Sequence, residues 1–292
     1  MSSTRPSSPS STADSLQPGP EYREAATRAP DPLLHLDPYR PPWLYRIVFG
    51  ILRLLVRLLF RFSVEGLENL PGPPYLIASN HQAWYDTAFI VAAFPKLPMI
   101  YTMARRDTVF NRRWKRALVP LFGVFPIQPH QGQLDEGGVA SVYHVLQRGG
   151  VVLIFPEGRY SRGHALQTLR KGVGHFALQA AVPICPVALS GTERLRPFGR
   201  VQISIRPSVW PNPPPALNLN TRVTRILENV RRAILGGFER EEAQRRRPGR
   251  MRRLSSRLRG PMDRQQVESD GRVPASYPAE EAAAGESGSR RE

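Results

Sequence analysis

The sequence has little cysteine and little lysine. Its one cysteine, Cys185, excludes an intramolecular disulfide and any metal site built from several cysteines, and no bound metal is expected. Only three of the 41 basic residues are lysines, and with 24 acidic residues the net charge is +17. Such a surface suits polyanions, either nucleic acid or the anionic headgroups of a bilayer. Charge alone does not separate the two.

A long uncharged apolar run is also missing. The most hydrophobic segment, Trp43–Phe62, has no uncharged stretch longer than six residues, whereas a spanning helix needs about 20 apolar residues. On a helix its four arginines fall within about 80° of one another. We therefore predict an amphipathic helix over residues 42–62 that lies in the bilayer interface, with an amphipathic helix docked on the core as the alternative. The expected membrane contacts are Trp43, Tyr45, Arg46, Arg53, Arg57 and Arg61.

Both ends of the chain lack a periodic apolar pattern. Residues 1–40 are rich in Ser and Pro, and residues 244–292 are Arg-rich and then small and polar, so both are predicted to be disordered tails. The domain is expected to span 41–243. No signal-peptide pattern precedes the hydrophobic segment. Arginine runs such as 245–247 come without a zinc-finger, helix-turn-helix or RNA-recognition signature, which argues against a nucleic-acid partner.

The middle of the chain alternates short apolar runs with helical patterns. Strands are predicted at Tyr75–Ser79, Met99–Met103, Val124–Ile127, Val151–Phe155, Ile184–Leu189 and Val201–Arg206. Helices are predicted at Thr87–Phe94, Arg112–Val119, Glu136–Gln147, Gly172–Ala180 and Thr221–Gln244. This order predicts an α/β fold with a mixed, largely parallel sheet flanked by helices, preceded by the amphipathic membrane helix.

A first candidate site follows the strand at 75–79. His81 suits general-base work because its side chain titrates near neutrality, and a carboxylate that orients the ring improves that base. Asp86 is five residues away and does not face His81 on a continuous helix. The two side chains can meet only if His81 lies on a loop and Asp86 begins the next helix. The alternative is that Asp86 merely caps that helix.

A second candidate site follows the strand at 151–155. The run Phe155-Pro156-Glu157-Gly158 places a tight turn directly after a buried strand, with Arg159 next. Backbone amides and guanidinium groups at such a turn form a site for phosphate or carboxylate. Glu157 is expected to bind substrate hydroxyls or an arginine. The alternative is a surface turn with solvated charges.

Together these segments resemble the glycerolipid acyltransferase family, which includes the 1-acylglycerol-3-phosphate acyltransferases. Asn80-His81-(four residues)-Asp86 is similar to its first block, Gly123–Ile127 to the second, Phe155–Gly158 with Ser161 to the third, and Val182–Ala188 to the fourth. The blocks occur in the family's order, and the resemblance spans residues 64–191. It implies a membrane-associated α/β enzyme in which His81 is the general base and Asp86 orients it.

The resemblance also implies the substrates. The donor is expected to be acyl-CoA or acyl-carrier protein as co-substrate, with no bound cofactor, and the acceptor a lysophospholipid or related lipid. The protein is expected on the cytoplasmic face, peripheral or monotopic, on anionic lipid. The family's second block usually ends in an arginine that contacts the acceptor's phosphate, where this chain has Pro129. The expected substrate-binding residues are Asn80, Arg105, Arg106, Gly123, Phe155, Pro156, Glu157, Gly158, Arg159, Ser161 and Lys171.

Two other functions remain to be weighed. A catalytically inactive lipid-binding membrane protein on the same fold is the main alternative, although such a protein has no need of both His81 and Asp86. A hydrolase is disfavoured because the sequence has no Gly-x-Ser-x-Gly motif. Cys185, between Ile184 and Pro186 in an apolar run, is a poor nucleophile.

Overall fold

The computed structural model of the protein describes residues 18–25, 37–128, 135–161, 166–212 and 216–246. Its strands are β1 (Arg61–Glu65), β2 (Tyr75–Ser79), β3 (Ile100–Arg105), β4 (Val124–Ile127), β5 (Val151–Ile154), β6 (Ile184–Ser190) and β7 (Arg200–Ile205). Its helices are α1 (Pro20–Ala25), α2 (Trp43–Leu59), α3 (Asp86–Ala93), α4 (Arg106–Val109), α5 (Arg113–Leu118), α6 (Glu136–Gln147), α7 (Gly172–Ala180) and α8 (Leu219–Arg246), with short 3-10 turns at Leu67–Asn69 and Val119–Phe122.

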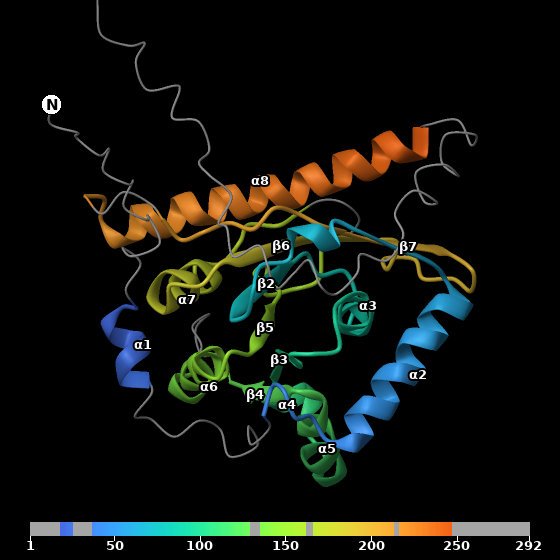
Figure 1. The fold of residues 1–292 in the computed structure, drawn as a ribbon, viewed down its shortest axis with the longest axis horizontal. Coiled ribbons are helices and arrows are strands. Elements are labelled where there is room, and N and C mark those ends of the chain that lie inside the picture. The colour runs from blue at the N-terminus through green and yellow to red at the C-terminus, as the bar shows by residue number, and fades with distance from the viewer. Residues whose placement is uncertain (1–17, 26–36, 129–134, 162–165, 213–215, 247–292) are drawn as a thin grey trace, which may run out of the picture. The chain divides into compact units, whose positions relative to one another are not determined.

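The strands form one mixed sheet in the order β1-β7-β6-β2-β5-β3-β4 (Figure 1). The strands β2 to β6 are mutually parallel, whereas β7 pairs antiparallel with β6 and parallel with β1. The predicted largely parallel α/β architecture is therefore confirmed. The edge at which β2 to β6 end is called the carboxyl edge below, and in parallel sheets the loops at this edge carry the reactive groups.

Each face of the sheet has its own apolar core, because successive side chains of a strand point to opposite faces. In β2, Leu76 and Ala78 belong to the core formed with α6, α7 and α8, whereas Tyr75 and Ile77 belong to the core formed with α3. Figure 1 shows α6 and α7 on one side of the strands and α3 and α2 on the other. Both faces are thus covered, as a largely parallel sheet requires.

The helix α2 buries a narrow stripe and exposes a wide one. Tyr45, Phe49 and Val56 pack into the cores, so the prediction that Tyr45 contacts a membrane is wrong. Arg61 is exposed but lies outside the helix, since α2 ends at Leu59 and Arg61 begins β1. The side of α2 that we call its apolar face is exposed and consists of Trp43, Ile47, Ile51, Leu54, Leu55, Leu58 and Leu59.

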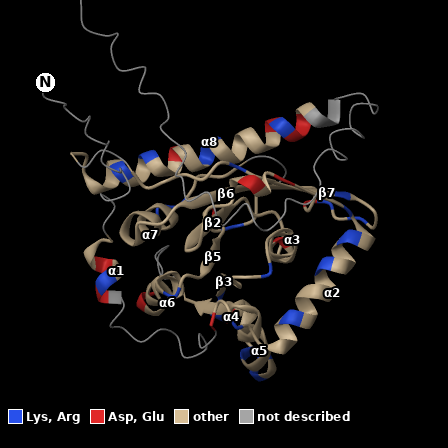
Figure 2. Ribbon diagram, viewed as in Figure 1, with Lys and Arg blue, Asp and Glu red and all other residues tan. Residues whose placement is uncertain are grey.

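The charges of α2 are all of one sign. Arg46 and Arg57 are exposed and Arg53 is partly buried, and the helix has no acidic residue (Figure 2). Burial lowers the pKa of Arg53, and the nearby Arg57 lowers it further. Within the described ranges, no helix combines the length and the apolar character needed to cross a bilayer.

Most predicted elements appear with small shifts at their ends. The bounds of β2, β4, α6 and α7 agree with the prediction, whereas β1 is not predicted and its first two residues fall in the range of the predicted amphipathic helix. The short helix α1 lies within the range predicted to be a disordered tail. There Tyr22 packs edge-on against Tyr143 of α6 at 5.4 Å between ring centres, so the prediction of a continuous disordered tail fails at residues 20–25.

Candidate active site

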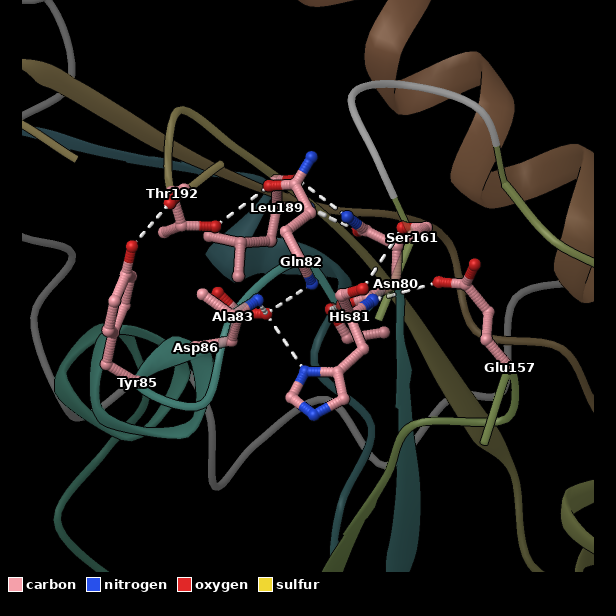
Figure 3. A network of polar contacts seen from close by, with 11 residues as sticks. Asn80, His81, Gln82, Ala83, Tyr85, Asp86, Glu157, Ser161, Leu189 and Thr192 are labelled. Atoms are coloured by element: carbon pink, nitrogen blue, oxygen red, sulfur yellow. Dashed lines mark hydrogen bonds and ion pairs between the residues drawn. The ribbon is translucent and has the colours of Figure 1, made fainter. Parts of the chain in front are cut away.

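His81 and Asp86 meet at the carboxyl edge of β2. His81 lies on the loop that leaves the strand, Asp86 is the first residue of α3, and the His81 Nδ1 atom lies 2.9 Å from the Asp86 Oδ2 atom (Figure 3). The predicted meeting of the two side chains is therefore confirmed. The Asp86 side chain is fully buried and the imidazole is 17% exposed. In Figure 3 the second ring nitrogen points away from the bonded network.

The Asp86 carboxylate organises the loop that precedes it instead of capping its own helix. Besides the imidazole, its Oδ2 atom accepts hydrogen bonds from the backbone N–H groups of Gln82 at 2.5 Å and Ala83 at 2.7 Å. A carboxylate at the first turn of a helix is also favoured by the helix dipole. The alternative of a simple N-cap is not seen, because Tyr85 occupies the cap position and no side chain caps the helix. The Asp86 side chain thus fixes the loop between His81 and α3 through these hydrogen bonds.

Two aromatic rings pack against the imidazole. The Phe155 ring is stacked on it with 3.8 Å between ring centres and an interplanar angle of 14°. The Tyr160 ring lies 4.5 Å away at 60° and is itself mostly exposed. Such contacts fix the orientation of the ring, and the hydrogen bond that the Nδ1–H group donates to Asp86 leaves Nε2 as the nitrogen available for a substrate.

Glu157 ties the second candidate loop to the first. It is buried, and its Oε1 atom accepts a hydrogen bond from the backbone N–H of His81 at 2.9 Å while Oε2 accepts one from Gln167 at 2.8 Å. Ser161 adds two bonds, since its N–H at 2.6 Å and its hydroxyl at 3.1 Å both donate to the carbonyl of His81. The two oxygens of Glu157 therefore hold backbone next to the base.

Replacing Glu157 by glutamine should lower kcat through the position of His81. One carboxylate oxygen becomes an NH₂ group facing a backbone N–H, so one buried donor loses its partner at a cost of about 1–3 kcal/mol. A small displacement of the loop then lowers kcat by about 10- to 100-fold, with little change in KM. Steady-state kinetics and thermal unfolding of the purified variant measure both effects.

Glu193→Gln is the matched control for this substitution. Glu193 lies at the same edge and also accepts a backbone hydrogen bond, from Gly191 at 3.0 Å. This control should leave kcat within about twofold, because Glu193 is exposed and a glutamine keeps one oxygen that accepts this single bond. Equal losses of kcat in the two variants would contradict a specific role for Glu157.

The Asn80 side chain joins the end of β2 to β6. It is buried, its side-chain NH₂ donates to the Leu189 carbonyl at 2.8 Å, and its carbonyl oxygen accepts from the Leu189 N–H at 2.8 Å. Further along, Gln82 Oε1 accepts a bond from the Thr192 hydroxyl at 2.8 Å, and the Tyr85 hydroxyl donates to the Thr192 carbonyl at 2.8 Å (Figure 3). The loop after β2 is therefore fastened to the loop after β6.

The remaining residues of the Phe155–Ser161 turn build its shape. Gly158 has φ +67°, and a Cβ there would collide with the Arg170 side chain. The carbonyl of Pro156, which is buried, accepts the N–H of Arg170 at 2.8 Å. Arg159 is exposed and donates to the Gln167 side chain at 2.8 Å. These contacts close the turn on the segment that follows it.

Gly123 and Lys171 are the other expected substrate-binding residues. Gly123 precedes β4, at the end of that strand opposite to the carboxyl edge, with φ +74°, and a Cβ there would meet the Ile100 carbonyl at 2.7 Å. The tight turn before β4 therefore requires glycine at this position. Lys171 is exposed and its ammonium donates to Asn220 of α8 at 3.4 Å. Pro129 lies outside the described residues.

Arg105 and Arg106, at the end of β3, line a cavity of about 380 Å³. Strands are about 4.8 Å apart, so this cavity begins about 10 Å from the end of β2, across β5. Arg105 forms an exposed ion pair with Asp107, with 2.7 Å between Nη2 and Oδ2. Three arginines against one aspartate make the cavity suitable for an anion. Its lining is Arg105, Arg106, Asp107, Phe110, Asn111, Arg116, Ile127 and Gln128.

Several site residues escaped prediction from the sequence. Tyr160 stands inside a recognised block, and its aromatic character was the available signal. For Thr192 the sequence offers no signal, because its partner Gln82 is 110 residues away. Gln167 and Arg116 stand in no motif that would mark them. Cys185 is buried, and burial raises the pKa of its thiol to about 12, which agrees with the prediction that it is a poor nucleophile.

The central part of the chain is similar to known proteins. The family described as Acyltransferase matches residues 61–190. The chain is 31% identical over 150 residues to the 1-acyl-sn-glycerol-3-phosphate acyltransferase of Pseudomonas aeruginosa, covering 50% of this chain and 52% of that protein. It is 25% identical over 169 residues to the chloroplastic 1-acyl-sn-glycerol-3-phosphate acyltransferase LPAT1 of Arabidopsis thaliana, covering 57% and 46%. The chain thus spans about half the length of these relatives.

A solved structure is similar as well. The crystal structure of the 1-acyl-sn-glycerophosphate acyltransferase PlsC from Thermotoga maritima aligns with a TM-score of 0.46 and 20% sequence identity, covering 65% of this chain and 80% of that one.

Proposed function

We propose that the protein moves a fatty acyl group from a thioester donor to a hydroxyl of a lysophospholipid-like acceptor, because residues 61–190 match the family described as Acyltransferase. The observation that carries this proposal is the pair of His81 and Asp86, joined at 2.9 Å with one ring nitrogen left open. The donor is acyl-CoA or acyl-carrier protein. The acceptor proposed first is 1-acylglycerol 3-phosphate, because it is the acceptor named for the similar proteins.

The proposed reaction uses His81 as the base and Asp86 as the group that orients it. The Nε2 atom of His81 takes the proton of the acceptor hydroxyl as its oxygen forms a bond to the thioester carbonyl carbon. The imidazolium that forms is stabilised by the buried Asp86 carboxylate. The tetrahedral intermediate then collapses, the carbon–sulfur bond breaks, and the leaving thiolate takes the proton from His81. The products are the ester and the free thiol.

The cavity at the end of β3 supports an acceptor that carries a phosphate. Guanidinium groups bind phosphate through short, charge-assisted hydrogen bonds, and the three arginines of this cavity stand at the same edge as His81. The distance between His81 and this cavity can be spanned by a glycerol phosphate together with an extended arginine side chain. In this proposal Arg105 and Arg106 supply the positive charge that Pro129 lacks.

The exposed apolar face of α2 supports placement at a membrane surface. Seven large apolar side chains are exposed on a helix whose only charges are arginines. Amphipathic helices of this kind bury their apolar face in the interface, while the arginines interact with anionic headgroups. In this proposal the protein lies on the cytoplasmic face of a membrane, where lipid acceptors are available.

A screen of acceptors tests the proposed function. The purified full chain is incubated with one acyl-CoA and, in separate reactions, lysophosphatidic acid, glycerol phosphate, lysophospholipids or neutral glycolipids. Mass spectrometry of the lipid products should show an acyl chain added to lysophosphatidic acid. Absence of any acylated lipid with both acyl-CoA and acyl-carrier protein would reject the function.

The double variant Arg105→Gln/Arg106→Gln should raise KM for the phosphate-bearing acceptor. Each lost charge-assisted bond is worth about 1.5–3 kcal/mol, which corresponds to about 10- to 100-fold in affinity. We therefore expect KM to rise by at least about tenfold, with a small effect on kcat. Arg225→Gln, on the exposed side of α8, is the control and should change neither constant. A KM that stays constant in the double variant would place the phosphate elsewhere.

A further inference from the structure

An exposed phenylalanine occupies a turn position that favours glycine. Residues 196–199, which we call the Phe198 turn, are closed by a hydrogen bond from the Gly199 N–H to the Arg196 carbonyl at 2.9 Å. Phe198 has φ +60° and its side chain is 65% exposed. In a four-residue turn whose second residue is proline and whose third residue has a positive φ, that third residue is usually glycine or asparagine. Phe198 thus combines backbone strain with an apolar ring in water.

The Phe198 turn continues the apolar face of α2. The Phe198 N–H donates to the Leu59 carbonyl at 2.6 Å, and the Arg61 N–H donates to the Gly199 carbonyl at 2.8 Å. The turn therefore lies beside the end of the helix where Leu55, Leu58 and Leu59 are exposed. The turn and the helix end form one apolar surface from two separate parts of the chain.

Basic side chains surround this surface. Arg194 and Arg196 are exposed on the loop, and Arg57 and Arg61 are exposed at the end of α2. One acidic side chain, Glu193, lies on the same loop, where it accepts the N–H of Gly191 at 3.0 Å. An apolar centre ringed mainly by arginines matches the interface of an anionic bilayer, which offers acyl chains below phosphate groups.

Strand directions place the Phe198 turn at the active-site edge. The strand β6 runs parallel to β2, so the loop between β6 and β7 leaves the sheet at the edge where His81 and Asp86 lie. The same loop is joined to the loop after β2 by the bond from the Tyr85 hydroxyl to the Thr192 carbonyl. A membrane contact here therefore brings the bilayer to the loops of the candidate site.

We propose that the Phe198 turn is a second membrane-insertion element, in which the Phe198 ring enters the interface of an anionic bilayer beside the apolar face of α2. Strain of this kind persists where the surrounding structure enforces it, and it is concentrated at functional positions. The occupant is a lipid surface because the patch joins exposed apolar groups to arginines. The inference extends the proposed placement on a membrane and does not depend on acyl transfer.

A single fluorescent label at position 198 tests the insertion. Cys185 is buried and its thiol pKa is raised to about 12, so in the full-length Phe198→Cys variant a nitrobenzoxadiazole maleimide should react at position 198. On vesicles of phosphatidylcholine with 30% phosphatidylglycerol, the emission should shift to the blue and rise several-fold, and spin-labelled lipids should quench it. The unmodified chain, treated identically, measures any label on Cys185.

Trp210→Cys is the matched control for the label. Trp210 is 50% exposed, and the bridge between Val209 and Ile184 places it near the start of β6, at the opposite edge of the sheet. Its label should remain in water on the same vesicles. A label at 198 that stays in water while co-sedimentation shows the protein bound would overturn the proposal, as would equal shifts at both positions.

Phe198→Gly separates the membrane role from a structural role. Glycine adopts a positive φ without strain, so the variant should unfold at the same temperature or higher. Its partition onto the anionic vesicles should nevertheless weaken by about tenfold, because an apolar ring is lost from the interface. Unchanged partition would overturn the proposal. A blue shift that depends on protein concentration without vesicles would do so too, by indicating contact between two copies.

Failure here is distinguishable from failure of the proposed function. Labelling and vesicle partition are read without any acyl donor, whereas the acceptor screen can be run with acceptors dispersed in detergent. If the protein inserts Phe198 but transfers no acyl group, this inference is supported and the proposed function is rejected.

Discussion

Replacing His81 by alanine should lower kcat for acyl transfer by about 10²- to 10⁴-fold, the range that a positioned general base contributes. The fold should survive, because the contacts of His81 with Glu157 and Ser161 are made by its backbone N–H and carbonyl, which alanine retains. KM for both substrates should change little, since the imidazole acts mainly in the transition state. Thermal unfolding and steady-state kinetics of the purified variant provide the measurement.

His175→Ala is the control for this substitution. His175 is a partly exposed residue of α7, and its loss should leave kcat within about twofold, as is usual for surface positions. His81→Gln keeps more of the side-chain volume beside Phe155 and should be as inactive as the alanine variant. Near-normal kcat in a correctly folded His81→Ala protein would remove the base from the proposed reaction and favour a catalytically inactive lipid-binding role.

Replacing Asp86 by asparagine should also lower kcat by about 10²- to 10⁴-fold, although the loop should keep its shape. The Oδ2 atom receives three donors, whereas Oδ1 is buried and finds no hydrogen-bond partner among the described residues. An asparagine therefore places its oxygen at the Oδ2 position and its NH₂ group at the Oδ1 position. The backbone bonds remain, and the charge that stabilises the imidazolium is lost.

The double variant His81→Ala/Asp86→Asn checks that the two side chains act as one unit. Residues that act together show non-additive effects, so the double variant should be about as slow as His81→Ala alone. If the two losses multiply instead, Asp86 acts independently of His81, for example by holding the loop. Asp86→Ala is a less selective test, because it leaves the Gln82 and Ala83 N–H groups without their acceptor.

The sequence predicted the parts of the fold that depend on local patterns. Buried strands such as β2 and β5 appear as short apolar runs, and α6 has a clear helical period, so their positions followed from the residues. The strand β1 was missed because Arg61–Glu65 directly follows a hydrophobic helix and forms only an edge strand, half-buried against β7. The alternation of apolar and polar residues in this strand is too short to distinguish it from the end of the helix.

Contacts between distant residues explain the rest. The period of α2 indicates an amphipathic helix but not which side meets the protein, and the buried side is a narrow stripe through Tyr45 and Val56. The bonds of Glu157 to the His81 N–H and of Asn80 to Leu189 join positions 76 and 109 residues apart. Both residues were expected to bind substrate because nothing local shows that a backbone group occupies them.

The rings packed on His81 affect the choice between two nucleophiles. A base that can take a proton from an alcohol can equally take one from water, and water would convert the thioester to a free acid. Phe155 at 3.8 Å and Tyr160 at 4.5 Å narrow the approach to an imidazole that is only 17% exposed, and apolar ring faces offer water few hydrogen bonds. An acceptor with its own acyl chain gains from the same rings. Under the proposed function, this packing would favour a lipid alcohol over water as the nucleophile.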